Sequence, residues 1–270
     1  MTKKQKLINR IARSFFNLLP QRSCLLYRAS KKYLDRYNND NNDDMQSNGE
    51  LAFLKQELSV DTGIVFDVGA NVGDWAKLAL EINSKISLHC FEPSSATFDI
   101  LKNNSFPPNV FLNNVGLGDT SGELELQIAG EGSGANSIYQ RRGVLDNIKF
   151  KAEKITVLTL DDYCSTHNLK QIDFLKIDVE GHELAVFKGM REMLKKGQVK
   201  VIQFEYGGSY LDARIQLGDI WELFSSLDYS FYKIFPAGPE RILKYSQDLE
   251  TFQYSNWVIR HNQHFQGGSR

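Results

Sequence analysis

The 270-residue chain has little cysteine, no long apolar run and almost no net charge, and each shortage excludes a class of protein. Its three cysteines lie far apart and form no C-x-x-C pair, which argues against structural zinc and favours a reducing compartment. No apolar run approaches the length of a membrane span, and residues 11–19, interrupted by Arg13 and Asn17, lack a signal-peptide core. The net charge of −1 does not suit a protein that binds polyanions over its whole surface. We therefore expect a cytoplasmic protein.

The charges are unevenly spread, and the first 37 residues are strongly basic. They contain ten lysines and arginines but one acid, Asp35. Residues 2–36 have helical spacing, with Pro20 breaking the helix near its middle. Two interpretations stay open: this basic arm lies on an anionic membrane surface, or it packs on the rest of the protein, which we favour. The run of Asn and Asp that follows predicts a polar linker, so we divide the chain into an extension (1–37), a linker (38–49), a main domain (50–264) and a tail (265–270).

The most informative stretch begins with an apolar run at 63–68 that predicts a buried strand. A glycine turn follows. Beyond it, apolar residues at helical spacing predict a helix, with Asp74 as its N-cap. In an open parallel sheet, such a turn lies at the carboxyl edge, where ligands bind.

The spacing of the glycines indicates which ligand. A dinucleotide site has G-x-G-x-x-G, but here Gly69 and Gly73 are four residues apart, with Asn71 between them. Asp67, at the mouth of the turn, would repel a phosphate and attract a cationic amino group. S-adenosylmethionine has such a group and no phosphate. We interpret these four residues as cofactor-binding, the plain alternative being an ordinary glycine turn.

Two further strand exits add candidates for the cofactor site. The strand predicted at 86–91 ends at Glu92, whose two oxygens suit the hydroxyls of a ribose. The strand predicted at 110–115 is followed by Asp119, which we also take as cofactor-binding.

A second motif has the same form as the first. An apolar strand at 172–177 runs into Asp178, Glu180 and His182, and a later strand at 199–204 ends at Glu205. These four side chains are the catalytic candidates, because parallel strands present their carboxyl ends at one edge of a sheet. For Glu180, compensation of a helix dipole is the alternative reading.

Between these motifs lies a glycine-rich loop at 130–137. It ends at Ser137 and is followed by Arg141 and Arg142, which could hold an anionic group on an acceptor molecule. We interpret the loop as a lid with three substrate-binding residues; a disordered connection between two strands is the alternative.

Strands and helices alternate along the whole main domain, which predicts one doubly wound α/β sheet. The last two strands, at 229–235 and 252–260, can pair antiparallel and would make the sheet mixed.

The segments 67–73 (DVGANVG), 91–93 (FEP) and 172–183 (IDFLKIDVEGHE) together resemble the FkbM family of S-adenosylmethionine-dependent methyltransferases. The resemblance runs from about residue 63 to residue 189, with a later element at 203–205. It implies a class I methyltransferase fold, Rossmann-like, with strand order 3-2-1-4-5-7-6. It also implies O-methylation of a sugar, glycan, glycolipid or natural product, and leaves the acceptor unnamed.

A sugar hydroxyl is a weak acid, so the reaction needs a base near the methyl donor. We rank Glu180 and Asp178 first, then His182 and Glu205. Asp178 and Glu205 could instead hold a divalent metal, but no ligand spacing indicates one and we expect none. The competing classes are a nicotinamide-dependent oxidoreductase and a non-enzymatic nucleotide-binding adaptor. A nucleic-acid substrate is disfavoured because the chain beyond Asn38 is net acidic.

Overall fold

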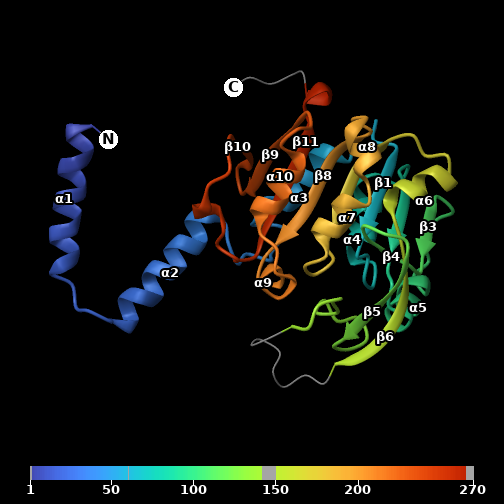
Figure 1. Ribbon diagram of the computed structural model, residues 1–270, viewed down its shortest axis with the longest axis horizontal. Helices are drawn as coiled ribbons and strands as arrows, with labels where there is room; N and C mark the ends of the chain where they lie inside the picture. Colours follow the sequence, from blue (N-terminus) through green and yellow to red (C-terminus); the bar gives the residue numbers. More distant parts are fainter. Residues whose placement is uncertain (1, 60, 142–149, 266–270) are drawn as a thin grey trace. The chain divides into compact units, whose positions relative to one another are not determined.

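The computed structural model describes residues 2–59, 61–141 and 150–265 (Figure 1). It divides into two units, residues 1–40 and residues 41–270. The first unit consists of α1 (Lys3–Asn17) and α2 (Cys24–Asn38), which Thr2 and Ser23 cap through their hydroxyl oxygens. Pro20 lies between the two helices, as its missing backbone donor predicts. Among the described helices of the chain, none combines the length and apolar content needed to cross a bilayer.

The second unit is built on an eight-stranded sheet in the order β10-β9-β11-β8-β7-β1-β2-β3. Five neighbouring strands run parallel, and β11 is antiparallel to both β8 and β9. The predicted class I methyltransferase order is therefore confirmed, with β10 added at one edge. The strands are β1 (Ile64–Val68), β2 (Ser87–Phe91), β3 (Val110–Asn113), β7 (Ile172–Ile177), β8 (Val199–Tyr206), β9 (Tyr229–Phe235), β10 (Gly238–Ile242) and β11 (Ser255–His261).

Hydrophobic cores lie on both faces of this sheet. In β1, Phe66 and Val68 belong to one buried cluster and Val65 to the other, as the two-residue period of a strand requires. The helices are α3 (Glu50–Glu57), α4 (Asp74–Ile82), α5 (Ser95–Lys102), α6 (Leu160–Thr166), α7 (Glu183–Lys188), α8 (Arg191–Lys195), α9 (Ser209–Ala213) and α10 (Leu217–Phe224), with short 3₁₀ turns at Gln247–Leu249 and Asn262–Phe265.

The prediction of a single sheet is wrong, because three strands form a second sheet of their own (Figure 1). These are β4 (Gly116–Leu117), β5 (Gly122–Ile128) and β6 (Lys151–Leu158), and β5 pairs antiparallel with β6 along its whole length. The small sheet buries its own cluster of Leu126, Ile155 and Val157. Alternation along a strand shows that one face is buried but not which sheet the strand joins.

Two local expectations also need correction. Gly73, not Asp74, is the N-cap of α4; its φ of +90° favours glycine, and a Cβ there would lie 2.7 Å from Leu101 Cδ1. Residues 238–242, between the last two predicted strands, where we predict no further strand, form β10. An edge strand tolerates Pro239 because the proline nitrogen need not donate a hydrogen bond there.

Candidate active site

The carboxyl ends of four adjacent strands surround a cavity of about 690 Å³. From β1 and β2 it is lined by residues that include Gly69, Asn71 and Glu92. From β7 and β8 it is lined by the four catalytic candidates, Asp178, Glu180, His182 and Glu205. The structure therefore places the two sequence motifs on one cavity, as strand exits at a common edge require.

Glu92 joins the exits of β1 and β2. Its Oε2 accepts a hydrogen bond from the Asn71 N–H at 3.0 Å, and its Oε1 accepts from the Ser94 N–H at 2.9 Å. Burial raises the pKa of Glu92 to about 7, although both backbone amides oppose the shift. Asn71 Oδ1 is buried and has no hydrogen-bond partner in the described residues. The cavity thus carries a carboxyl and an unsatisfied amide oxygen, both suited to the hydroxyl and amino groups of S-adenosylmethionine.

The other predicted cofactor residues have different surroundings. Gly69 lines the cavity, but a Cβ there would overlap Asp178 O at 1.8 Å, so glycine is needed for the close approach of β1 to the end of β7. Gly73, Asp67 and Asp119 are not among the lining residues. Asp67 is fully buried opposite Lys176 of β7, and burial raises its pKa to about 6.

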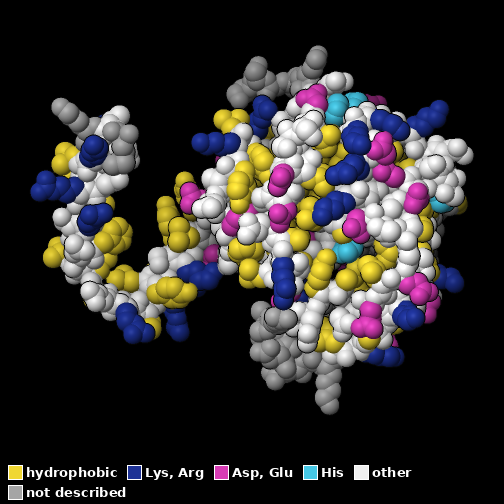
Figure 2. All heavy atoms as spheres, viewed as in Figure 1, with side chains coloured by type: hydrophobic (Ala, Val, Ile, Leu, Met, Phe, Trp, Pro, Cys, Tyr) yellow, Lys and Arg dark blue, Asp and Glu magenta, His cyan; other side chains and the backbone are white. Residues whose placement is uncertain are grey.

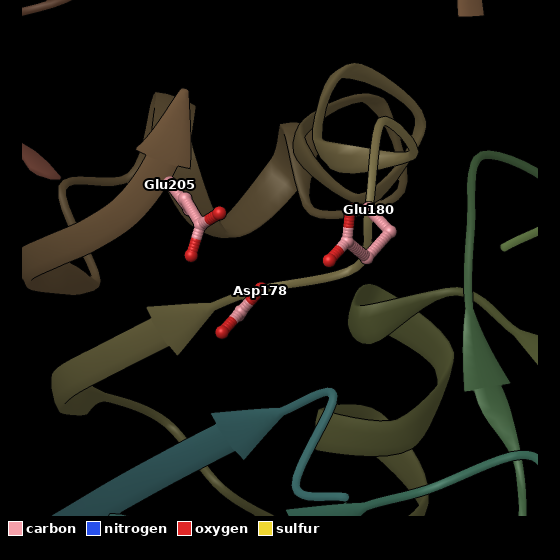
Figure 3. Close-up of side chains that lie close together, drawn as sticks. All are labelled: Asp178, Glu180 and Glu205. Carbon is pink, nitrogen blue, oxygen red and sulfur yellow. The ribbon is translucent and has the colours of Figure 1, made fainter. Parts of the chain in front are cut away.

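Asp178, Glu180 and Glu205 turn their carboxyl groups toward one another (Figure 3). One oxygen from each lies within 4.8 Å of the others, close enough to share a cation. Two of them already have cationic partners, because Lys176 Nζ lies 2.9 Å from Asp178 Oδ2 and Arg141 pairs with Glu180. The alternative of a shared divalent metal therefore competes with these two ion pairs.

Two of the three carboxyls, those of Glu180 and Glu205, have raised pKa values. Burial raises the pKa of Glu180 to about 7, with the neighbouring Asp178 charge adding to the shift and Arg141 opposing it. Burial raises the pKa of Glu205 well above its ordinary value, with Asp178 and Glu180 as further causes. Glu180 therefore titrates near neutral pH, and burial favours the neutral form of Glu205 more than in an exposed glutamate.

Tyr139, two residues beyond the glycine-rich loop, contacts His182. The imidazole Nδ1 lies 3.1 Å from the Tyr139 hydroxyl, and its Nε2 is buried without a partner among the described atoms. Burial lowers the pKa of His182 to about 4, against the raising effect of Asp119. The imidazole is therefore neutral at pH 7 and a weaker base than a free histidine.

The loop predicted as a lid lines the cavity through Ser133, Gly134 and Asn136. Ser137 Oγ then donates to Glu180 O at 2.8 Å, and Arg141 pairs with both Glu180 and, at 3.3 Å, Asp212. Ser137 and Arg141 thus fasten the segment to the turn after β7 and are not themselves lining residues. Arg142 lies outside the described residues.

The sequence interpretation missed several residues of the site. Asn41 and Asp43, which we assigned to a linker, line the cavity together with Tyr254. The Asn41 N–H donates to Tyr254 O at 2.8 Å, so the residue that directly precedes β11 holds this segment at the site. No local sequence pattern identifies Asn41 as a site residue. Lys176, in contrast, stands two residues before Asp178, and side chains at this spacing point to the same side of a strand, so the sequence could have predicted Lys176 as the partner of Asp178.

Comparison with known proteins agrees with the motifs. A family model described as a methyltransferase FkbM domain matches residues 67–231. The hexuronic acid methyltransferase AglP of Haloferax volcanii is 25% identical over 166 residues, covering 61% of this chain and 65% of that protein. The 2-O-methyltransferase NoeI of Sinorhizobium fredii is 29% identical over 189 residues, covering 66% of this chain and 76% of that protein.

Among solved structures, the plantazolicin methyltransferase BpumL in complex with a desmethyl analogue and SAH has a TM-score of 0.44 at 8% identity, covering 87% of this chain and 92% of that chain. Neither of the two sequence relatives is named as an oxidoreductase or an adaptor, so the two competing classes gain no support. Because the family model matches more than half of its residues, the chain belongs to the FkbM methyltransferase family.

Proposed function

We propose that the protein is a cytoplasmic S-adenosylmethionine-dependent O-methyltransferase that acts on a hydroxyl of a sugar, free or within a glycan or glycolipid. One observation carries the proposal: a group of three carboxyls, one of them half-ionised near neutral pH, shares a cavity with Asn71 and Glu92. The name of one relative, a hexuronic acid methyltransferase, supports a sugar acceptor, and the name of the other, a 2-O-methyltransferase, supports transfer to an oxygen.

When bound, S-adenosylmethionine supplies a methyl group that is already electrophilic. Glu92 and Asn71 would hold its ribose and methionine ends over the exits of β1 and β2. The acceptor hydroxyl would then lie beside Asp178, Glu180 and Glu205, and the negative charge there favours the cationic cofactor. What the protein must add is alignment of the hydroxyl and removal of its proton.

Glu180 is the best candidate for that base. A general base is most effective when its pKa is close to the working pH, and Glu180 meets this condition while His182 titrates far below it. Glu180 also sits at φ +52°, a conformation that a non-glycine residue adopts at a cost and that is common at functional sites. Asp178, held by Lys176, would keep the local field negative while Glu180 takes the proton.

The function is tested by offering the purified chain isotopically labelled S-adenosylmethionine with uronate and neutral sugar glycosides. Mass spectrometry should show one labelled methyl group on a sugar oxygen. Calorimetry with S-adenosylmethionine and NAD provides the check on the cofactor. Binding of NAD in place of S-adenosylmethionine would contradict the proposal, as would transfer to no sugar in the panel.

The role of Glu180 gives the first prediction. With the accepted sugar, kcat/KM should rise with pH through a midpoint near 7, because the ionised form of Glu180 is the active one. Glu180→Gln should lower kcat by about 10²–10⁴-fold. The matched control is Glu205→Gln, because burial favours the neutral form of that carboxyl and an amide resembles it, so this change should cost much less. Equal losses in the two variants would remove Glu180 from the role of base.

A further inference from the structure

Within the first unit, the two helices do not cover each other's apolar side chains. None of the described side chains of α1 or α2 is buried, and twelve large apolar or aromatic side chains of residues 7–37 are between 40% and 84% exposed. Leu7, Ile11 and Phe15 of α1, together with its C-cap residue Leu18, recur at the spacing of one helical face. A helix that leaves such a face uncovered needs an apolar partner, because a soluble surface rarely exposes a continuous apolar stripe.

In the same helices, lysines and arginines far outnumber acids. Lys6, Arg10 and Arg13 of α1 share a second face, at spacings of four and three residues. Over residues 1–37 ten cations stand against one acid, and Figure 2 shows basic and hydrophobic side chains together on the surface of this unit. An apolar face beside a cationic face is the pattern of a helix that lies in the interface of an anionic membrane.

Other occupants fit less well. A second copy of the arm would bring one strongly cationic helix pair against another. The acidic catalytic unit attracts cations, but it offers no matching apolar face in its described residues. Its exposed large apolar side chains come from five different segments: Ile100, Phe111, Leu124, Leu211 and Leu243. A bilayer with anionic headgroups supplies both an apolar layer and the opposite charge.

The arm is joined directly to the wall of the catalytic cavity. α2 ends at Asn38, and Asn41, only three residues later, lines the cavity. Three residues span at most about 10 Å, so the chain length alone keeps the cavity-lining Asn41 within about 10 Å of the membrane-bound end of α2. We propose that residues 2–38 bind an anionic membrane surface and that the acceptor sugar is carried on a lipid in that membrane. The acceptor half of this proposal rests on the proposed function.

Binding is tested with the full chain and vesicles of phosphatidylcholine, with and without phosphatidylglycerol. The chain should sediment with the anionic vesicles only, and salt should release it because screening weakens exposed charge interactions. Reversing Lys6, Arg10 and Arg13 to Glu should weaken binding about tenfold or more. The double variant Ile11→Glu with Phe15→Glu should abolish vesicle binding, since the apolar face is lost.

Matched controls make the same chemical changes in the catalytic unit. Leu243→Glu replaces a side chain that is 83% exposed, and Lys195→Glu an exposed lysine of α8; both should leave vesicle binding unchanged. The proposal is overturned if the chain sediments with neither kind of vesicle, or if it binds both kinds equally. A changed oligomeric state or a lower melting temperature in the arm variants, without vesicle binding, would assign the face to another copy or to the catalytic unit.

The acceptor is tested separately by comparing a sugar on a lipid in anionic vesicles with the same sugar as a soluble glycoside. The lipid-borne sugar should be methylated with a KM at least about tenfold lower, and the arm variants should lose only this advantage. Equal KM values with intact methyl transfer would overturn the lipid-borne acceptor and leave the proposed function standing. Vesicle binding without methylation of either sugar would overturn the proposed function, and the lipid-borne acceptor with it, and would leave only the membrane binding.

Discussion

Glu92 shows how one side chain serves both structure and ligand. Its two oxygens accept the backbone amides of Asn71 and Ser94, so it fixes the first turn against the second strand exit before any ligand binds. Each oxygen retains a lone pair for a ribose hydroxyl. Substituting it therefore risks a structural effect as well as a loss of affinity, and an experiment has to separate the two.

We predict that Glu92→Ala weakens S-adenosylmethionine binding by about 1–3 kcal/mol, the cost of losing charge-assisted hydrogen bonds. Isothermal calorimetry measures the change. Asn114→Ala is the matched control. Asn114 Nδ2 donates to the carbonyl oxygens of Glu92 and Pro93, so its removal should loosen the same turn without removing the carboxyl. If the control loses as much affinity as Glu92→Ala, then Glu92 acts on the turn and not on the cofactor.

At the scale of elements, the segment of residues 130–141, which follows β5, is fastened to the turn after β7. Three residues do this: Ser137 donates to the Glu180 carbonyl, Tyr139 contacts His182, and Arg141 pairs with Glu180. Arg141 also pairs with Asp212 of α9. The segment also lines the cavity. It therefore links the wall on the acceptor side to the residue that we assign as base.

Arg141→Ala should release this segment. We expect faster hydrogen exchange of the backbone amides of residues 130–139, an acceptor KM raised about tenfold, which corresponds to about 1.4 kcal/mol, and little change in cofactor affinity. The pH midpoint of activity should move upward, because Arg141 opposes the raised pKa of Glu180. Lys154→Ala, an exposed β6 residue paired only loosely with Glu123 at 3.8 Å, is the control and should change none of these. Unchanged exchange in Arg141→Ala would show that the pair does not hold the segment.

At the scale of the whole molecule, buried acids make stability depend on pH. Burial raises the pKa of Glu183 to about 8 and those of Glu92 and Glu180 to about 7, above their ordinary value of 4.5. The folded state then binds more protons than the unfolded state, so this stabilisation is complete below pH 4.5 and is lost as the pH rises through these values. His89 and His182, whose pKa values burial lowers to about 4, act in the opposite direction only below about pH 6.5.

The free energy of unfolding should therefore fall between pH 6.5 and pH 8, with about 1–2 kcal/mol coming from Glu183 alone. Urea denaturation at several pH values measures the slope. Glu183→Gln should flatten it, whereas Glu192→Gln, an exposed acid of α8, should leave it unchanged. A slope that is the same in Glu183→Gln and the wild type would contradict the assignment.

The sequence by itself determined the parts of this protein that depend on neighbouring residues. Strands show as short apolar runs, and polar residues follow where the strands end, so Glu92, Asp178 and Glu205 could be assigned to one sheet edge before any contact was known. The fold class and the family followed from the same motifs.

Only the tertiary structure decided what depends on residues far apart in the chain. Alternation in residues 122–128 marks a half-buried strand whichever sheet it joins, so the second sheet could not be predicted. Asn41 reaches the cavity because Tyr254, more than two hundred residues later, binds its amide. Arg141 became a fastening residue because Glu180 and Asp212 converge on it from different elements. These pairings depend on packing of the complete domain, which no local pattern records.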